Sequence, residues 1–268
     1  MKVLPEEASL IKIKSTSSTS APVKPILSQS IYYTQLQSLS MLSYERYKKL
    51  FNDEGFNKLF YDKNKFKSLF HTSGPYYLFF DTETTGLPLD NYAPTSNTAN
   101  WPRLVQLSWI VTDVDGNIFK ESDKIIYPEG FTIPTESSNI HGITTAIAKR
   151  RGIPLATAVE EFLEDMKTVN TLVGHNISFD LHIMGAELVR MGKRDIMQQK
   201  PSICTMQSSV NYCKIPSKNG FGYKWPRLQE LHVKLFGYEF EDAHNSMSDI
   251  TATLKCFKEL KRRGIINK

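Results

Sequence analysis

An apolar, aromatic run at 76–80, YYLFF, is followed at once by two acidic residues, Asp81 and Glu83. A short run of this composition is typical of a strand buried in a sheet. Because side chains alternate along a strand, the two carboxylates lie on one face, where they repel each other unless a cation neutralises them. Oxygen ligands of this kind suit Mg²⁺ or Mn²⁺. The pair alone also fits a solvated strand end, so the rest of the chain decides between the two interpretations.

Strands and helices alternate along the chain after residue 76. Further strands are expected at 105–113, around 117–127 and at 171–175, with a loop at 128–134. Helical spacing predicts helices at 145–151, 155–169, 179–191, 228–236 and 246–263. The early strands form a meander and the later ones alternate with helices, which indicates an α/β protein with a mixed sheet flanked by helices.

Two further acidic residues lie at the starts of predicted helices. Asp180 comes early in one helix, and Asp249 lies in the first turns of the last helix, five residues after His244. At 100° per residue His244 would point about 140° away from Asp249 within a helix, so we expect it in the preceding loop. Taken separately, Asp180 suits a helix N-terminus and His244 suits the surface. Together with Asp81 and Glu83 they place four acids and one histidine where catalytic groups of α/β sheets collect.

Three motifs resemble the DEDDh branch of the 3′–5′ exonuclease superfamily, which includes the proofreading epsilon subunit of bacterial replicases and ribonuclease T. The motifs are DTETTGL at 81–87, HNISFD at 175–180 and HNSMSD at 244–249, and HGIT at 141–144 resembles the proofreading group. The resemblance covers residues 76–263. It implies a ribonuclease H-like fold, an α/β architecture with a mixed five-stranded sheet flanked by helices, and hydrolysis of phosphodiester bonds at a 3′ end.

The resemblance also implies a site that holds two divalent cations, Mg²⁺ or Mn²⁺. Asp81 would bind both ions, Glu83 and Asp249 would complete the tighter position, and Asp180 would support the second one through water. His244 would be the general base that takes a proton from the attacking water. The product would be a nucleoside 5′-monophosphate and a shortened 3′ end.

Substrate contacts are implied for five more residues. The resemblance places Thr82, Thr84 and Leu87 against the terminal nucleotide, and it places Asn176 and Phe179 in the same groove. For Leu87 and Phe179, a place in the hydrophobic core is an equally good interpretation.

A basic and aromatic segment, GYKWPRLQEL, stands at 222–231, around the start of the predicted helix 228–236. Lys224, Trp225 and Arg227 have the side chains that stack on bases and contact phosphates. The alternative that we favour from the sequence is that Trp225 docks the helix onto the sheet.

The first 74 residues lie outside the resemblance and carry the whole net charge of +5, with 11 basic and 6 acidic residues against 22 of each in the remainder. Residues 1–38, with STSSTS at 15–20, are expected to be a flexible tail. Residues 39–74 are expected to form a short helical extension, and the exonuclease domain is expected at 75–268. The extension could contact nucleic acid or tether the domain to a DNA polymerase, whereas a solvated helix face is the simpler interpretation.

Composition excludes several other classes of protein. Hydrophobic residues make up 40% and charged residues 23%, which is typical of a globular protein rather than a disordered one. No apolar run approaches the roughly 18 residues of a membrane span, so no membrane partner is expected. The three cysteines form no CxxC pair, which argues against a disulfide framework or a zinc knuckle. With no signal-peptide pattern at the N-terminus, we expect a cytoplasmic protein.

Three functions follow from these residues. The first is a 3′–5′ exonuclease acting on the single-stranded or frayed 3′ end of DNA, in proofreading or repair. The second is an RNA exonuclease of the ribonuclease T or oligoribonuclease type, and the third is a nuclease-fold module that binds nucleic acid without cleaving it. HGIT favours DNA, and the presence of all five catalytic residues argues against the binding module.

Overall fold

The computed structural model describes residues 74–241, 243 and 245–266 of the chain. The chain divides into two compact units, Met1–Phe70 and His71–Lys268, and the described residues all belong to the second. The tail expected at 1–38, nearly all of the extension expected at 39–74, and His244 therefore lie outside the described residues. Among the helices that are described, none combines the length and the apolar character needed to cross a membrane.

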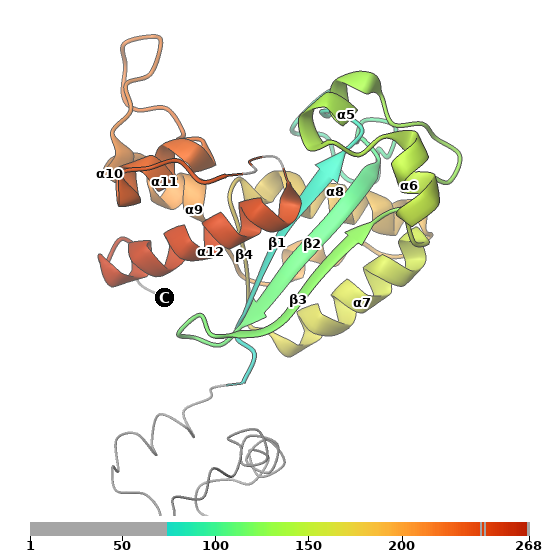
Figure 1. Cartoon of the computed structure of the whole chain (residues 1–268), viewed down its shortest axis with the longest axis horizontal. Coiled ribbons are helices and arrows are strands. Elements are labelled where there is room, and N and C mark those ends of the chain that lie inside the picture. The colour runs from blue at the N-terminus through green and yellow to red at the C-terminus, as the bar shows by residue number, and fades with distance from the viewer. Residues whose placement is uncertain (1–73, 242, 244, 267–268) are drawn as a thin grey trace, which may run out of the picture. The chain divides into compact units, whose positions relative to one another are not determined.

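A five-stranded mixed sheet forms the centre of the second unit (Figure 1). Its strands are β1 (Tyr77–Thr84), β2 (Leu104–Thr112), β3 (Ile118–Ile125), β4 (Thr171–Gly174) and β5 (Ser202–Cys204), in the order β3-β2-β1-β4-β5. β2 is antiparallel to both of its neighbours, β1 and β3, whereas β4 runs parallel to β1 and β5 runs parallel to β4. The expected mixed sheet is confirmed, with the acid-bearing strand β1 at its centre.

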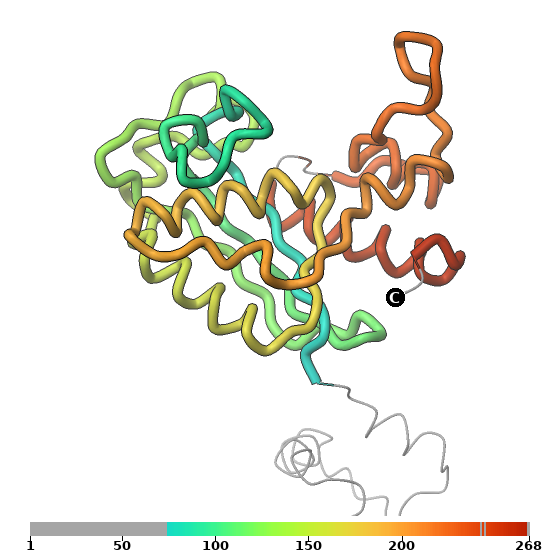
Figure 2. The backbone as a smooth tube through the Cα atoms, turned by 180° about the vertical axis from the view of Figure 1, so that it is seen from behind, coloured from blue at the N-terminus to red at the C-terminus, as the bar shows by residue number. Residues whose placement is uncertain are grey.

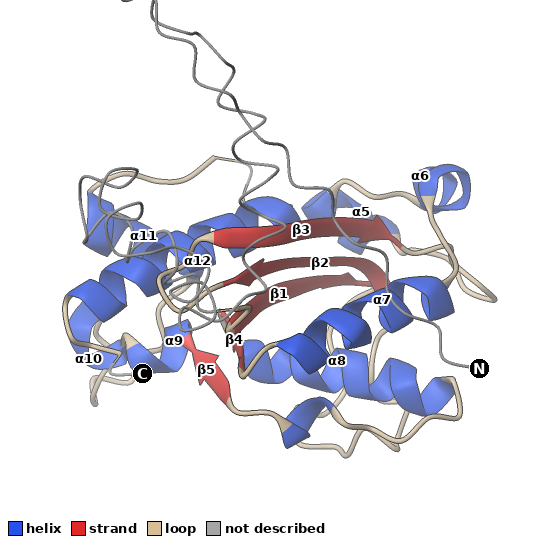
Figure 3. Cartoon of the chain, turned by 90° about the horizontal axis from the view of Figure 1, so that it is seen from below, coloured by secondary structure: helices blue, strands red, loops and turns tan. Residues whose placement is uncertain are grey.

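Alternate side chains of β1 enter two different hydrophobic layers, one on each face of the sheet. Leu78 and Phe80 pack in the core that includes residues of α7 (Leu155–Thr168) and α8 (Ile177–Arg190). Tyr77 and Phe79 pack in the core that includes residues of α11 (Leu228–Phe236) and α12 (Ser246–Arg262). Figure 3 shows the sheet edge-on with helices on both sides. The strand is buried on both faces, as its uninterrupted apolar sequence predicted.

The remaining elements are short. They are α5 (Thr135–His141), α6 (Thr145–Arg151), the 3₁₀ turn η1 (Met197–Gln199), α9 (Thr205–Ser208) and α10 (Val210–Cys213). The helices predicted at 145–151 and 228–236 match α6 and α11 residue for residue. The strand β5 and the helices α9 and α10 were not predicted, because three or four residues are too few to display a period. The helix α5 was not predicted because its sequence, TESSNIH, contains a single apolar residue and so shows no apolar spacing.

Candidate active site

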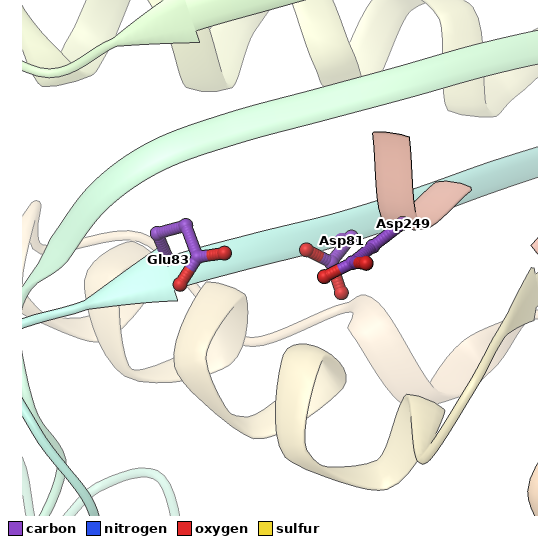
Figure 4. Close-up of side chains that lie close together, drawn as sticks. All are labelled: Asp81, Glu83 and Asp249. Carbon is purple, nitrogen blue, oxygen red and sulfur yellow. The ribbon is translucent and has the colours of Figure 1, made fainter. Parts of the chain in front are cut away.

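Two carboxylates extend from the same face of β1 near its C-terminal end. Asp81 and Glu83 follow the alternation of Tyr77 and Phe79, so they emerge on the face that α12 covers. Asp249, in the first turn of α12, reaches the same place from the helix. One oxygen from each carboxylate lies within 4.8 Å of the others, and Figure 4 shows Asp249 directed at Asp81. The structure therefore brings together three of the four acids that the motifs selected.

The start of α12 is fixed against β1 by local capping and by one contact across the sheet. The side chain of Asn245 caps the helix by accepting a hydrogen bond from the Ser248 backbone N–H at 3.3 Å. The hydroxyl of Ser246, which is fully buried, donates to the backbone carbonyl of Asp81 at 3.0 Å. Ser246 was not predicted to belong to the site. Its contact with Asp81 sets where Asp249 meets the strand.

The fourth acid approaches β1 from the other face. Asp180 lies in the first turn of α8 and is buried. One of its carboxylate oxygens accepts two hydrogen bonds from Thr82, from the backbone N–H at 3.0 Å and from the hydroxyl at 2.7 Å. Thr82 points away from Asp81 and Glu83 along the alternating strand. Asp180 thus stands beside the cluster of Asp81, Glu83 and Asp249 rather than within it.

Burial and mutual repulsion change the acidity of these carboxyl groups. Burial raises the pKa of Asp81 well above its usual value, and the three neighbouring carboxylates raise it further, while the hydroxyl of Ser246 lowers it. Burial and the carboxylates of Asp249 and Asp180 raise the pKa of Glu83 to about 8. Burial raises the pKa of Asp180 to about 7, although the bonds from Thr82 oppose this. The four acids resist being charged together unless a cation joins them.

The donor atoms of the cluster suit a hard divalent cation. Asp81, Glu83 and Asp249 offer carboxylate oxygens, without nitrogen or sulfur ligands in this three-residue group. Such a donor set favours Mg²⁺ or Mn²⁺ over softer transition metals, so the residues present fit the metal that the sequence predicted.

The five residues predicted to contact substrate fall into different environments. Thr82 and Thr84 are buried; both donor groups of Thr82 are used on Asp180, and the hydroxyl of Thr84 donates to the carbonyl of Gly86 at 2.7 Å. Asn176 is exposed and precedes α8 in the left-handed conformation, with φ 68°. Their contacts with a nucleotide stay predictions.

The structure distinguishes between a substrate contact and a core position for Leu87 and Phe179. Leu87 is 82% exposed just after β1, so its interpretation as a core residue is wrong. Phe179 is half-buried and packs against the core that includes α7 and α8 residues, which favours its core interpretation. Leu87 therefore remains available for a ligand.

His175 was part of a recognised motif, but its role was not predicted. Its Nδ1 lies 3.0 Å from the Thr205 hydroxyl and its Nε2 lies 3.0 Å from the carbonyl of Pro226. A carbonyl can only accept, so Nε2 carries the proton. Burial lowers the pKa of His175 to about 4, which keeps the ring neutral near pH 7. His175 thereby ties the turn before α8 to the segment before α11, a long-range link that sequence spacing does not reveal.

The mixed sheet, with a carboxylate cluster where α12 meets its central strand, defines an α/β protein with a candidate metal site. A family model described as Exonuclease matches residues 78–257, which is more than half of the chain, and the chain belongs to this exonuclease family. The family resemblance seen in the three motifs and the predicted fold class are both confirmed.

Individual relatives match the same region. The chain is 28% identical to the PolC-type DNA polymerase III of Pediococcus pentosaceus over 182 residues, which cover 67% of this chain and 11% of that protein. It is 27% identical to the DNA polymerase III subunit epsilon of Treponema pallidum, over 66% of this chain and 73% of the subunit. The chain thus spans only a small part of the PolC-type relative.

Solved structures support the fold. Exonuclease I of E. coli in complex with a dA16 oligonucleotide is similar with a TM-score of 0.56 and 21% identity, over 70% of this chain and 41% of that one.

Proposed function

We propose that this protein is a metal-dependent 3′–5′ exonuclease that releases nucleoside 5′-monophosphates from the 3′ end of DNA, in proofreading or repair. The observation that carries the proposal is the convergence of Asp81, Glu83 and Asp249, with carboxylate oxygens within 4.8 Å of one another. A group of half-buried like charges is unfavourable for folding, so its presence at the end of the central strand points to a ligand that offsets it.

Two divalent cations, Mg²⁺ or Mn²⁺, are the proposed cofactors. Asp81, Glu83 and Asp249 would hold them, with Asp180 beside them. Bound there, the cations would offset the charge of the phosphodiester and favour deprotonation of the attacking water. The protein's own contribution is to fix the carboxylates: Ser246 holds the strand at Asp81, and Thr82 holds Asp180.

His244 is proposed as the general base, on the strength of its place in the motif five residues before Asp249. It would accept a proton from the attacking water, which requires a neutral imidazole. The exposed side chains of Leu87 and Asn176 are proposed to meet the terminal nucleotide.

The names of the relatives support DNA as the substrate. One relative is named as a subunit of DNA polymerase III and another as a PolC-type DNA polymerase III, and exonuclease I was solved with a DNA oligonucleotide. We propose that the basic residues 1–74 dock a DNA polymerase or help to hold DNA. We also propose a cytoplasmic location, and the cysteines, all of which are free, support a reducing compartment.

A matched digestion tests the proposal. The full chain would be given 5′-labelled single-stranded DNA and RNA of one sequence, with Mg²⁺ or with EDTA. We expect a ladder that shortens from the 3′ end of DNA, requires Mg²⁺, and disappears with Asp81→Asn but not with the exposed control Glu121→Gln. A ladder on RNA alone would assign the protein to RNA processing, and none on either substrate with a folded protein would favour a binding module.

A further inference from the structure

A hairpin-like segment at 214–227 projects from the domain between α10 and α11, and Figures 1 and 2 show it standing clear of the helices around it. Its two arms are held together by backbone contacts. Pro216 and Tyr223 form a bridge, and the Lys224 N–H donates to the carbonyl of Ile215 at 2.9 Å. The Ser217 N–H donates to the carbonyl of Gly222 at 3.2 Å. The segment is therefore a defined structure rather than a featureless loop.

Three aromatic side chains of this segment are exposed. Phe221 is 86% exposed, Trp225 is 61% exposed and Tyr223 is 45% exposed. Within the part of the chain that the structure describes, none of these rings stacks on another ring. The docking of Trp225 against the sheet, which the sequence favoured, is therefore wrong. Three exposed rings on one projection form a surface that a flat, apolar partner can cover.

The charge of the segment selects the partner. Residues 214–227 contain four basic side chains and no acidic one: Lys214, Lys218, Lys224 and Arg227. Lys224 forms an ion pair with Glu230 at 2.6 Å, whereas Lys214 and Lys218 are exposed. The exposed guanidinium of Arg227 lies 3.4 Å from Glu230. Alternating rings and cations match the alternating bases and phosphates of a single strand.

The root of the segment is joined to the edge that carries the acids. The carbonyl of Pro226 accepts the bond from His175 Nε2, and His175 immediately precedes Asn176 and the helix that carries Asp180. The segment is therefore fixed to the turn between β4 and α8. A DNA strand whose 3′ end lies at the acids would have this segment on the same side of the domain.

We propose that the segment 214–227 is a stacking platform for single-stranded DNA, in which Phe221, Tyr223 and Trp225 hold bases on the 5′ side of the nucleotide being removed. The inference rests on the proposed exonuclease function for its direction along the strand. Stacking on rings is indifferent to sequence, since every base has a π-face, so the platform grips any single strand and excludes a fully paired one.

Binding without cleavage tests the contact itself. With the full chain in EDTA, the affinity for 5′-fluorescein dT20 would be measured by anisotropy for the wild type, Trp225→Ala, Phe221→Ala and the control Phe119→Ala. Phe119 is an exposed ring on the far edge strand β3. We expect each platform variant to raise the Kd at least about fivefold, and the control to leave it unchanged. Equal Kd values for all four proteins would overturn the proposal.

Tryptophan fluorescence reports the ring directly. The chain has three tryptophans, of which Trp101 and Trp109 are buried and Trp225 is exposed. Unlabelled dT20 should quench the emission of the wild type and should leave the emission of Trp225→Phe nearly unchanged. Quenching of equal depth in both proteins would place the DNA elsewhere.

Substrate length separates the platform from the catalytic site. In Mg²⁺, Trp225→Ala should raise the KM for dT20 at least about fivefold more than the KM for the p-nitrophenyl ester of thymidine 5′-monophosphate, which carries no base on the 5′ side of the scissile bond. The same loss on both substrates would overturn the platform. If the wild type cleaves neither substrate, the exonuclease proposal fails, while the measurements in EDTA still decide the platform.

Discussion

Thr82 donates two hydrogen bonds to a single carboxylate oxygen of Asp180, one from its backbone N–H at 3.0 Å and one from its hydroxyl at 2.7 Å. The two residues are 98 positions apart. Asp180 needs this support because it comes from α8, on the opposite face of β1 from Asp249. The central strand β1 therefore contributes to the site from both of its faces. Asp81 and Glu83 lie on the face that α12 covers, and Thr82 lies on the opposite face, where it holds Asp180 of α8.

Removing the Thr82 hydroxyl should weaken the response to metal. Thr82→Val keeps the side-chain volume and the backbone bond but deletes the 2.7 Å bond to Asp180, so the pKa of Asp180 should rise further. Residues that orient a metal ligand typically contribute 10–100-fold to metal affinity or activity. We expect the Mg²⁺ concentration for half-maximal activity to rise about tenfold. The measurement is activity against Mg²⁺ concentration, with Thr82→Ser as the matched control that keeps the bond; identical curves would contradict the support role.

Neutralising Asp81 should abolish activity without unfolding the protein. Burial and the neighbouring carboxylates disfavour its charge, so Asp81→Asn relieves repulsion in the metal-free protein. We expect its Tm in EDTA at pH 8 to equal or exceed that of the wild type, and the rise in Tm on adding Mg²⁺ to be lost. Calorimetry with a parallel digestion assay checks both. A variant as active as the wild type would remove Asp81 from the site.

Much of this site could be predicted because its signals are local. An apolar run followed by Asp81 and Glu83 specifies a buried strand with two acids on one face, and helical spacing from residue 246 onward places Asp249 in the first turns of a helix. The contacts that arrange the site are not local. Ser246 meets Asp81 across 165 positions, and His175 meets Pro226 across 51, so no period or spacing reveals them.

Short elements were missed for a related reason. β5 has three residues, and its place at the sheet edge is set by pairing with β4 rather than by its own pattern. Trp225 was misjudged because burial of a large ring is the usual outcome for a tryptophan, and only the fold shows that its segment projects away from the core.

The metal-free protein should lose stability as the pH rises. The carboxyl groups of Glu83 and Asp180 have pKa values of about 8 and about 7 in the folded state, against ordinary values near 4.5 and 3.8. The folded state therefore holds more protons than the unfolded state between these limits, and the free energy of unfolding falls with increasing pH. His175 acts in the opposite sense, but only below about pH 6.5, where its unfolded form takes up a proton.

The diagnostic window is accordingly pH 6.5 to 8.5. In EDTA the Tm should fall across this window, by about 2–4 °C for each kcal/mol lost, and Glu83→Gln should fall less steeply. Mg²⁺ should restore more of the Tm at pH 8.5 than at pH 6.5, because binding requires the deprotonated acids. A metal-free Tm that rises with pH throughout the window would contradict the assignment of raised pKa values.

Glu187 should contribute more to stability than any surface acid of comparable pairing. Its Oε1 accepts from Arg103 Nε at 3.0 Å and from the Leu104 N–H at 2.9 Å, and it forms an ion pair with Arg190 Nη1 at 2.9 Å. The residue is fully buried in α8. The carbonyl of Arg103 in turn accepts from the Thr85 N–H at 2.9 Å, so Glu187 anchors the chain that lies beside the end of β1.

Truncating Glu187 leaves two arginines facing a buried space. Removing one partner of a buried ion pair costs about 3–5 kcal/mol, so we expect Glu187→Ala to lower the free energy of unfolding by about 3 kcal/mol. The control is Glu160→Ala, which removes an exposed pair with Lys193 and should cost at most about 1 kcal/mol. Urea denaturation of the Mg²⁺-bound proteins measures both. Equal losses in the free energy of unfolding would show that the buried carboxylate of Glu187 contributes no more than an exposed ion pair does. The segment beside β1 would then be held by its backbone hydrogen bonds alone.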